Sequence, residues 1–352
     1  MPKGLARPVQ LAEAGGAMFA RYNDGSVACW GPGDHGPCGF SYWAYKVKDV
    51  GCLSSMSMSY SGAGLGPGDK FTAWHLPGAV SFPQDPYRGS LPNGRRAVAI
   101  VPGGDSFWAL DEVGQVWMIG NRFYGPGGRE FENLRNWVPL AFPGHVAKLT
   151  RAGCAILDGG DLYCTDGLWL SDFDDEVTLE KDPVHVPFVE PVVDYASGGV
   201  GVACILGAEG TLMCRGSNYY GLLGLPWPEV EDRTTYDVIP NLPPLKEFKL
   251  TYDFTNVCGR TFDGTVLCWG SNGLGLKIVD DPDLQLAFIS EPTRIDPGFA
   301  DVLDYAMSDD SVCVVREGSD AVLCRGFTGT GNCRIERGWH EVSYEHCDPN
   351  AP

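Results

Sequence analysis

The sequence predicts an all-β protein, a seven-bladed β-propeller whose blades each hold about four antiparallel strands. The first observation behind this prediction is a short motif, a glycine turn followed by a strand, that occurs seven times along the chain. The second is the distance between copies, about fifty residues, which is the length of one blade. The third is a repeated spacing of ten residues between two cysteines that flank the turn: Cys154 and Cys164, Cys204 and Cys214, Cys258 and Cys268.

The clearest copy of the repeat is residues 257–270, VCGRTFDGTVLCWG. Apolar and polar residues alternate on both sides of Asp263-Gly264, which predicts a β-hairpin because glycine supplies the positive φ that such a turn needs. If three residues form the loop, Cys258 lies opposite Cys268 and both Sγ atoms share a face. Opposed residues have Cα atoms about 4.5–5.5 Å apart, within the range of a disulfide. The stretch therefore predicts two strands joined by a turn and a covalent bridge.

The other copies divide the whole chain, residues 1–352, into repeated units of a single domain. The motif occupies residues 25–31, 69–75, 114–120, 160–166, 210–216, 264–270 and 320–326. The predicted units are 6–46, 47–90, 97–140, 146–190, 192–243, 245–297 and 299–330, followed by a C-terminal closing segment at 331–352. A unit of this size cannot bury both faces of its sheet until neighbouring units stack on it, so the units are expected to close into a ring.

The repeat resembles that of the regulator of chromosome condensation family, in the cysteine-bearing form common in secreted bacterial proteins. The resemblance covers about residues 9–330 and is best preserved at 197–224 and 255–275, where Gly-Ser-Asn follows the third strand. It implies a propeller. It implies no single activity, because propellers of this family include exchange factors, photoreceptors and a β-lactamase inhibitor.

Thirteen cysteines predict a disulfide framework. A fourth cross-strand pair, Cys313 and Cys324, has one more residue between its members than the other three. A bridge from Cys333 to Cys347 is expected to hold the C-terminal tail, and a bridge from Cys38 to Cys52 is the sixth expected pair. Cys29 faces Phe19 across its hairpin, so it is either free or diverted to another cysteine. In the third unit Trp108 and Met118 take the cysteine places, and apolar packing is expected to replace the bridge there.

This framework predicts an oxidising compartment, and hence a secreted or cell-surface protein, because cytosolic thiols stay reduced. The alternative is that the cysteines are reduced core thiols. The first five residues lack the apolar region of a secretory signal peptide. Either the signal has been removed, or the protein is not exported by that route.

Composition narrows the expected partners. The formal charge of −19 argues against nucleic acid and anionic membranes as partners, because both bind clusters of Lys and Arg. The alternative is that the charge only keeps the protein soluble. No run of eighteen apolar residues predicts a membrane span. No metal, cofactor or catalytic residue is predicted, because the six histidines are scattered and no hydrolase, P-loop or dinucleotide motif is present. The acidic residues 172–176 offer the oxygen ligands that calcium prefers, but they lack calcium-loop spacing, so a solvated loop is expected and a calcium site is the alternative.

Aromatic residues of the loops that are expected to connect blades are the candidate partner-binding residues, because loops on a rigid scaffold carry recognition and aromatic side chains dominate binding energy. They are Tyr42, Trp43, Phe123, Tyr124, Trp169, Tyr219, Tyr220 and Trp227. The alternative for Tyr42 and Trp43 is that they only form the outer strand of the first unit.

Two further segments concern the ring itself. The proline-rich residues 76–96 are expected to connect two blades. Ring closure usually borrows a strand from the opposite terminus, so residues 341–344 are expected to complete a terminal blade.

The sequence therefore favours a non-enzymatic, exported module that binds a protein or cell-surface component through aromatic loops; a β-lactamase inhibitor is a special case. A second hypothesis is a structural subunit of an extracellular filament, appendage or surface layer, in which an odd cysteine or exposed strand edges join copies. A third is catalysis, by hydrolysis at the central channel or by guanine-nucleotide exchange, and exchange on a cytosolic GTPase conflicts with the predicted disulfides.

Overall fold

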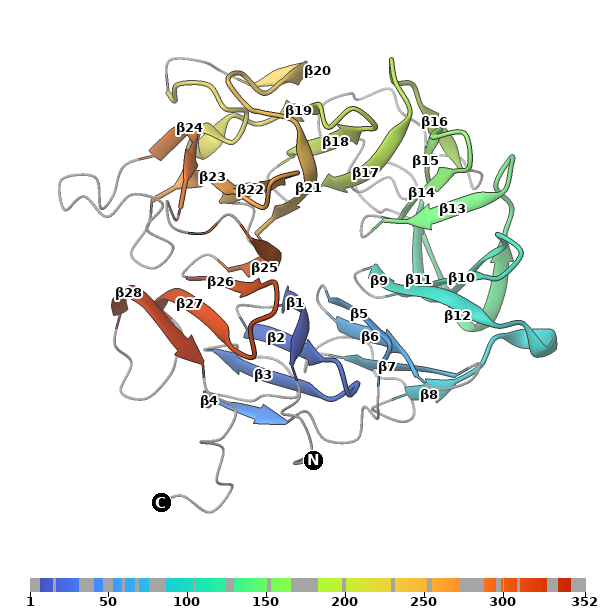
Figure 1. Cartoon of the computed structure of the whole chain (residues 1–352). Helices are drawn as coiled ribbons and strands as arrows, with labels where there is room; N and C mark the ends of the chain where they lie inside the picture. Colours follow the sequence, from blue (N-terminus) through green and yellow to red (C-terminus); the bar gives the residue numbers. More distant parts are fainter. Residues whose placement is uncertain are drawn as a thin grey trace.

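The structure, a computed structural model, is a ring of seven four-stranded antiparallel sheets (Figure 1). In each blade the strands follow one another in chain order from the centre of the ring outwards. The residues it describes are 7–14, 17–31, 41–46, 53–58, 61–66, 70–75, 87–103, 106–124, 130–150, 153–165, 183–197, 201–228, 232–251, 255–272, 288–295, 299, 301–308, 311–327 and 335–342. The predicted all-β, seven-bladed propeller is confirmed.

The first four blades hold strands β1 to β16. Blade 1 contains β1 (Pro8–Ala14), β2 (Ala17–Tyr22), β3 (Val27–Gly31) and β4 (Ser41–Lys46). Blade 2 contains β5 (Ser55–Met58), β6 (Ser61–Leu65), β7 (Phe71–His75) and β8 (Tyr87–Gly89). Blade 3 contains β9 (Ala97–Gly103), β10 (Ser106–Asp111), β11 (Val116–Tyr124) and β12 (Glu130–Leu140). Blade 4 contains β13 (Val146–Leu149), β14 (Cys154–Leu157), β15 (Leu162–Cys164) and β16 (Val184–Val186).

The last three blades hold β17 to β28. Blade 5 contains β17 (Val192–Ser197), β18 (Ala203–Gly207), β19 (Leu212–Gly216) and β20 (Arg233–Val238). Blade 6 contains β21 (Leu245–Leu250), β22 (Asn256–Thr261), β23 (Val266–Ser271) and β24 (Phe288–Arg294). Blade 7 contains β25 (Val302–Met307), β26 (Ser311–Arg316), β27 (Val322–Phe327) and β28 (Ile335–Val342). The described residues include no α-helix, only short 3₁₀ turns such as η1 (Pro92–Gly94) and η3 (Tyr219–Gly221).

The central hairpins have the register that the cysteine spacing predicts. Cys258 pairs with Cys268 across β22 and β23, and the bridge between them joins Cα atoms 4.1 Å apart. The other three predicted bridges, Cys154–Cys164, Cys204–Cys214 and Cys313–Cys324, are also formed. In blade 3, Trp108 and Met118 are paired at the same place and both are buried. All four cross-strand disulfides are therefore confirmed.

Cys29 is fully buried in blade 1 and faces Phe19, as expected, but it is disulfide-bonded rather than free. The described cysteines of blades 4 to 7 are all paired with one another, so its partner is one of the four cysteines outside the described residues, Cys38, Cys52, Cys333 and Cys347. Of the two alternatives for Cys29, diversion to another cysteine is therefore the one that holds, and Cys29 is not the odd cysteine. The predicted bridges of those four cysteines lie outside the described residues.

A recurrent backbone hydrogen bond joins consecutive blades at the turn between the second and third strands. The carbonyl of the turn glycine accepts a hydrogen bond from the backbone amide of a residue at the start of the next blade. The Val192 amide donates to Gly160 and the Leu245 amide donates to Gly210, both at 2.9 Å. Gly210 has a φ of +87°, and a Cβ there would lie 2.8 Å from the carbonyl oxygen of Leu245. Glycine is therefore required both by the turn and by the approach of the next blade.

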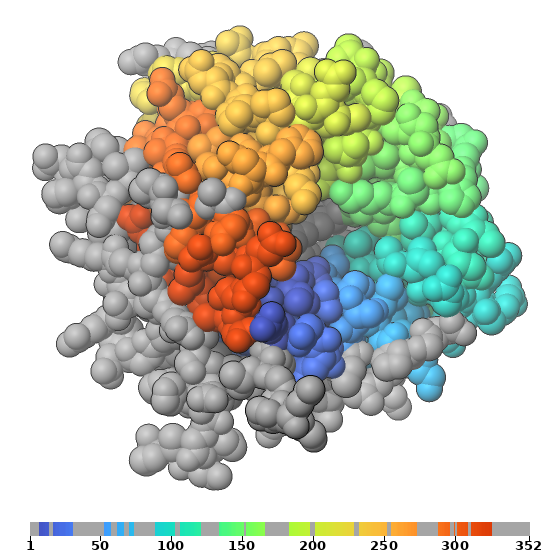
Figure 2. All heavy atoms as spheres, in the orientation of Figure 1, coloured from blue at the N-terminus to red at the C-terminus, as the bar shows by residue number. Residues whose placement is uncertain are grey.

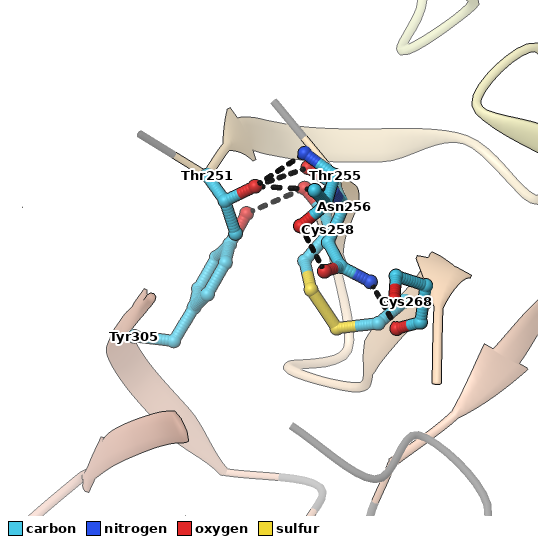
Figure 3. The surroundings of a disulfide bond; sticks show 7 residues. Thr251, Thr255, Asn256, Cys258, Cys268 and Tyr305 are labelled. Carbon is cyan, nitrogen blue, oxygen red and sulfur yellow. Dashed lines mark hydrogen bonds between the residues drawn. A yellow bond between two sulfur atoms is a disulfide. The ribbon is translucent and has the colours of Figure 1, made fainter. Parts of the chain in front are cut away.

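The apolar cores lie between the blades. One of them joins Cys258 and Cys268 of blade 6 to Val302, Tyr305 and Val312 of blade 7. The buried Tyr305 hydroxyl donates to the Cys258 carbonyl at 2.9 Å, so the hairpin with its disulfide also receives a polar contact from its neighbour (Figure 3). This arrangement fits the expectation that one blade cannot bury its own faces.

The ring closes by packing rather than by strand exchange. Among the described strands, blade 1 is built from β1 to β4 alone and blade 7 from β25 to β28 alone, so the expected borrowing across the termini does not occur. Instead β28 completes blade 7 as its own outermost strand. Leu11 and Trp30 of blade 1 share a buried cluster with Ala306 and Val315 of blade 7. Figure 2 shows the ring around a central hollow, where a cavity of about 300 Å³ is lined by residues of β1, β5, β21 and β25.

Candidate interaction surface

The strand order decides which loops share a face of the ring. Because each blade is an antiparallel meander, the turns between second and third strands lie on one face, which we call the turn face. The connections between third and fourth strands leave from the opposite face, which we call the loop face. The predicted partner-binding residues that the structure describes belong to the ends of these connections or lie within them, so they sit inside single blades and not in the expected loops between blades. The topology therefore places them on one face of the molecule.

The described part of the chain covers these eight residues unevenly. Tyr42 and Trp43 lie in β4, which supports the alternative that they form the outer strand, and Phe123 and Tyr124 end β11, but only the backbone of these four residues is described. Trp169 and the acidic residues 172–176 lie outside the described residues. The predicted residues whose side chains the structure does describe are in the connection between β19 and β20: Tyr219, Tyr220 and Trp227.

Asn218 organises this connection from inside. Its side chain is fully buried; its Oδ1 accepts from the Leu223 amide at 3.1 Å and its Nδ2 donates to the Leu225 carbonyl at 3.2 Å. Its own amide donates to the Asp232 carboxylate at 2.9 Å, at the far end of the connection. The Asn of the Gly-Ser-Asn pattern thus hydrogen-bonds loop backbone groups that have no neighbouring strand to pair with. These hydrogen bonds hold the loop in one conformation.

The next blade anchors the same loop. Trp269 of blade 6 is fully buried and donates its indole N–H to the Leu222 carbonyl at 2.9 Å. Gly221 has a φ of +76°, and a Cβ there would lie 2.5 Å from the Ser290 hydroxyl of β24. Glycine is therefore needed where the loop of blade 5 touches blade 6. The contact fixes the loop against two blades at once.

Four aromatic side chains meet on this loop, and we call them the aromatic cluster: Tyr219, Tyr220, Trp227 and Phe288. The Tyr219 ring lies 4.3 Å from Tyr220 and 5.2 Å from Trp227, measured between centroids. Phe288, the first residue of β24, lies 4.7 Å from Trp227 and 5.3 Å from Tyr220. Most of these contacts are edge-to-face, the geometry that aromatic quadrupoles favour. Blades 5 and 6 therefore share one aromatic patch.

The cluster is held in place and partly open to solvent. Tyr219 is 46% exposed, while Tyr220, Trp227 and Phe288 are half-buried. Tyr220 has a φ of +67°, a left-handed conformation that costs a non-glycine residue of the order of 1 kcal/mol or more and that the surroundings must enforce. Aromatic rings that are already ordered lose little entropy when they bind, so the arrangement suits a contact with another molecule.

Two other polar regions are occupied by internal ion pairs. On the turn face, a cavity of about 850 Å³ is bordered by Arg95, Glu112 and His145, but Arg95 pairs with Glu112 at 3.7 Å and His145 with Asp158 at 3.0 Å. At the central hollow, Lys249 pairs with Asp304 at 2.7 Å. Within the described ranges, no group of three or more His, Cys, Asp or Glu residues is placed to hold a metal ion. None of the described helices is long and apolar enough to cross a membrane.

Comparison with solved structures identifies the fold. Human WBSCR16 is 17% identical, with a TM-score of 0.68 over 89% of this chain and 87% of that one. Prp20p from Saccharomyces cerevisiae, whose structure was described together with its binding to Gsp1p and histones, is 17% identical, with a TM-score of 0.63 over 85% of this chain and 80% of that one. Yeast RCC1 (Prp20) bound to Kap60 is 16% identical, with a TM-score of 0.63 over 85% of this chain and 77% of that one.

These likenesses, below 25% identity, show the fold: the chain is an RCC1-like propeller, as its repeat predicts. No protein-family model matches the chain, and no curated protein matches its sequence.

Proposed function

We propose that the chain is a non-enzymatic, exported binding module that docks on a protein or cell-surface component through the aromatic cluster of its loop face. The observation that carries the proposal is the preorganised, half-exposed set of four rings between blades 5 and 6. Tyr and Trp are the residues that most often dominate binding energy at protein interfaces. The likeness to RCC1-type propellers, one of which is seen bound to Kap60, supports a protein as the partner.

Export is the second part of the proposal. Four bridged hairpins and a bonded Cys29 fit an oxidising compartment, because disulfides of this number are rare where glutathione keeps thiols reduced. The net charge of −19 favours a partner surface that is apolar or basic over nucleic acid. A β-lactamase is one enzyme surface to test, since the resemblance of the repeat includes an inhibitor of that class.

The parity of the cysteines supports a second candidate, a subunit of an extracellular assembly. Eight of the nine described cysteines pair with one another, and the ninth, Cys29, is bonded to a cysteine outside the described residues. Of the thirteen cysteines in the chain, three then remain. At least one of these cannot form a bridge within the chain. The test is the mass in solution with and without reductant. A covalent dimer whose mass halves when reductant is added would favour assembly.

The binding proposal is tested by photo-crosslinking at two matched aromatic sites. A photoreactive amino acid replaces Tyr219 in the cluster in one protein and Phe262 in another, because Phe262 is 65% exposed but lies on the turn face. Both proteins are incubated with material from the source organism's surface and medium. A product at one defined mass from position 219 and none from 262 is expected. Equal products from both positions, or none from either, would contradict the proposal.

A further inference from the structure

One face of blade 5 carries polar side chains into its contact with blade 4. Strand pairing sets Ser197 opposite Ala203 and Ala203 opposite Arg215, so these three side chains form one row on one face. Tyr195 lies two residues from Ser197 and therefore shares the face. The same face holds Ile205, which packs with Ile156 and Leu162 of blade 4. The only side chain between Ser197 and Arg215 in this row is the methyl group of Ala203.

The hydroxyl groups on this face lie next to one another, but none of them makes a hydrogen bond of normal geometry in the described structure. Tyr195 Oη, Ser197 Oγ and Tyr236 Oη are buried atoms without a hydrogen bond. Burial raises the pKa of Tyr195, and hydrogen-bond interactions with the Ser197 and Tyr236 hydroxyls and the positive charge of Arg215 lower it in part, so the four groups form one cluster. A buried hydroxyl that makes no hydrogen bond costs about 1–3 kcal/mol. Three together indicate that a polar group from outside the chain belongs between them.

Arg215 supplies a positive charge at the same place. Its guanidinium lies 5.0 Å from the ring centroid of Tyr236, and no ion pair joins it to a carboxylate among the described residues. In blades 1 and 6 the corresponding residue, after the cysteine of the third strand, is Trp30 or Trp269, and both are buried apolar anchors. Blade 5 thus replaces an apolar anchor by a cation. Its guanidinium interacts with the Tyr236 hydroxyl, and a cluster of such donors suits an anion and not a metal ion.

Blade 7 shows how the same pattern looks when the chain satisfies it internally. Asp304-Tyr305-Ala306 repeats Asp194-Tyr195-Ala196, and Arg325 takes the place of Arg215. There the Tyr305 hydroxyl donates to the Cys258 carbonyl at 2.9 Å and Arg325 Nη1 donates to the Ile295 carbonyl at 3.2 Å. In blade 5 the Tyr195 hydroxyl makes no such hydrogen bond to a carbonyl of blade 4. Among the described residues of this pattern, blade 7 leaves only the Nε of Arg325 without a hydrogen-bond partner, whereas blade 5 leaves three hydroxyl groups.

We propose that blade 5 binds a small tetrahedral oxyanion, phosphate or sulfate, between the Arg215 guanidinium and the hydroxyls of Tyr195, Ser197 and Tyr236. Guanidinium and hydroxyl donors are the groups that recognise such anions, and the partly buried site strengthens each contact. Ser197 ends β17 and Arg215 lies next to the end of β19, so the site adjoins the loop face. The bound anion would join the inner, third and outer strands of one blade.

The test measures the melting temperature of the oxidised full chain as inorganic phosphate, and separately sulfate, replaces chloride at constant ionic strength. Wild type is expected to gain melting temperature with increasing oxyanion, because a ligand bound only by the folded state stabilises it. Tyr195→Phe and Arg215→Gln are each expected to weaken binding about tenfold or more in calorimetric titrations with phosphate. Tyr195→Phe is also expected to keep the melting temperature measured in chloride, since its hydroxyl is unpaired without the anion.

The matched control is Tyr305→Phe, which removes a hydroxyl that is already paired. It should lower the melting temperature in chloride and leave phosphate affinity unchanged. Two results would overturn the proposal. One is that wild type binds neither phosphate nor sulfate. The other is that Tyr195→Phe behaves like Tyr305→Phe, with a lower melting temperature and unaltered oxyanion binding.

Discussion

At the scale of residues, two Lys–Asp pairs between blades, near the centre of the ring, differ in burial and therefore in their expected contribution to stability. Lys148 reaches from blade 4 to Asp194 of blade 5 at 2.9 Å, and Lys249 reaches from blade 6 to Asp304 of blade 7 at 2.7 Å. The second pair is more buried, with side chains 20% and 15% exposed against 46% and 28%. Asp304 also accepts from the Leu11 amide of blade 1 at 2.7 Å. Asp304 thus links three blades.

The two aspartates are therefore expected to differ in their contribution to stability. Asp304→Asn should lower the free energy of unfolding by about 2–4 kcal/mol, because it leaves Lys249 partly buried beside a neutral group and weakens the contact with blade 1. Asp194→Asn should cost about 1 kcal/mol or less, since water solvates Lys148. Urea unfolding of both variants measures the difference. If both variants lose the same free energy of unfolding, burial does not determine how much these ion pairs contribute to stability.

Several residue pairings could be predicted from spacing alone, and one group of contacts could not. The four cysteine pairs and the Trp108–Met118 pair follow from the period of a strand and the length of a turn, which are local rules. Phe288 was missed as a member of the aromatic cluster. It meets Tyr220 and Trp227 only because blade 6 stacks on blade 5, a contact between segments far apart in sequence. No local pattern around Phe288 indicates that partner.

At the scale of elements, the bridged hairpin is the unit that repeats. The bridge between Cys258 and Cys268 closes a short loop, so its entropic effect on the unfolded chain is about 3 kcal/mol. Replacing both cysteines, as Cys258→Ala with Cys268→Ala, should lower the free energy of unfolding by about that amount in urea without reductant. The hairpin should still form, because blade 3 keeps the same register with Trp108 and Met118. Unfolding unchanged by the double substitution would contradict this account.

The hairpins were more predictable than the outer strands. Second and third strands carry a glycine turn, alternating side chains and often two cysteines, so several local signals agree. The outermost strand pairs on one edge only and has weaker alternation. Strand β8, residues Tyr87–Gly89, lies within the proline-rich segment that was expected to be a connection, and it forms because β7 offers an edge for it. The prediction for that segment was wrong about this strand.

At the scale of the whole molecule, the ring holds itself together without exchanging strands between its termini. The Arg7 guanidinium lies 2.5 Å from Asp320, and a buried cluster containing Trp30 and Ala306 joins blade 1 to blade 7. The number of blades could be predicted from the repeat, because each copy encodes one sheet. It did not reveal how the ends meet, because closure depends on contacts made by blades 1 and 7 alone.

The choice of binding surface likewise emerges only from the assembled ring. The sequence predicts eight aromatic residues near loops, and the topology assigns their connections to one face. Only the packing of blade 6 on blade 5 gathers Tyr219, Tyr220 and Trp227 with Phe288 into a single ordered patch. The proposed function therefore depends on a rigid ring that presents this patch to another molecule.

The most direct test measures the affinity of the crosslinked partner for two variants of the chain, together with their melting temperatures. Tyr219→Ala combined with Trp227→Ala should weaken binding at least about tenfold, because aromatic side chains at an interface centre carry much of its energy. Its melting temperature should stay close to that of wild type, and Phe262→Ala on the turn face should bind normally. Unchanged affinity in the double variant, or a loss of affinity matched by a loss of melting temperature, would contradict the account.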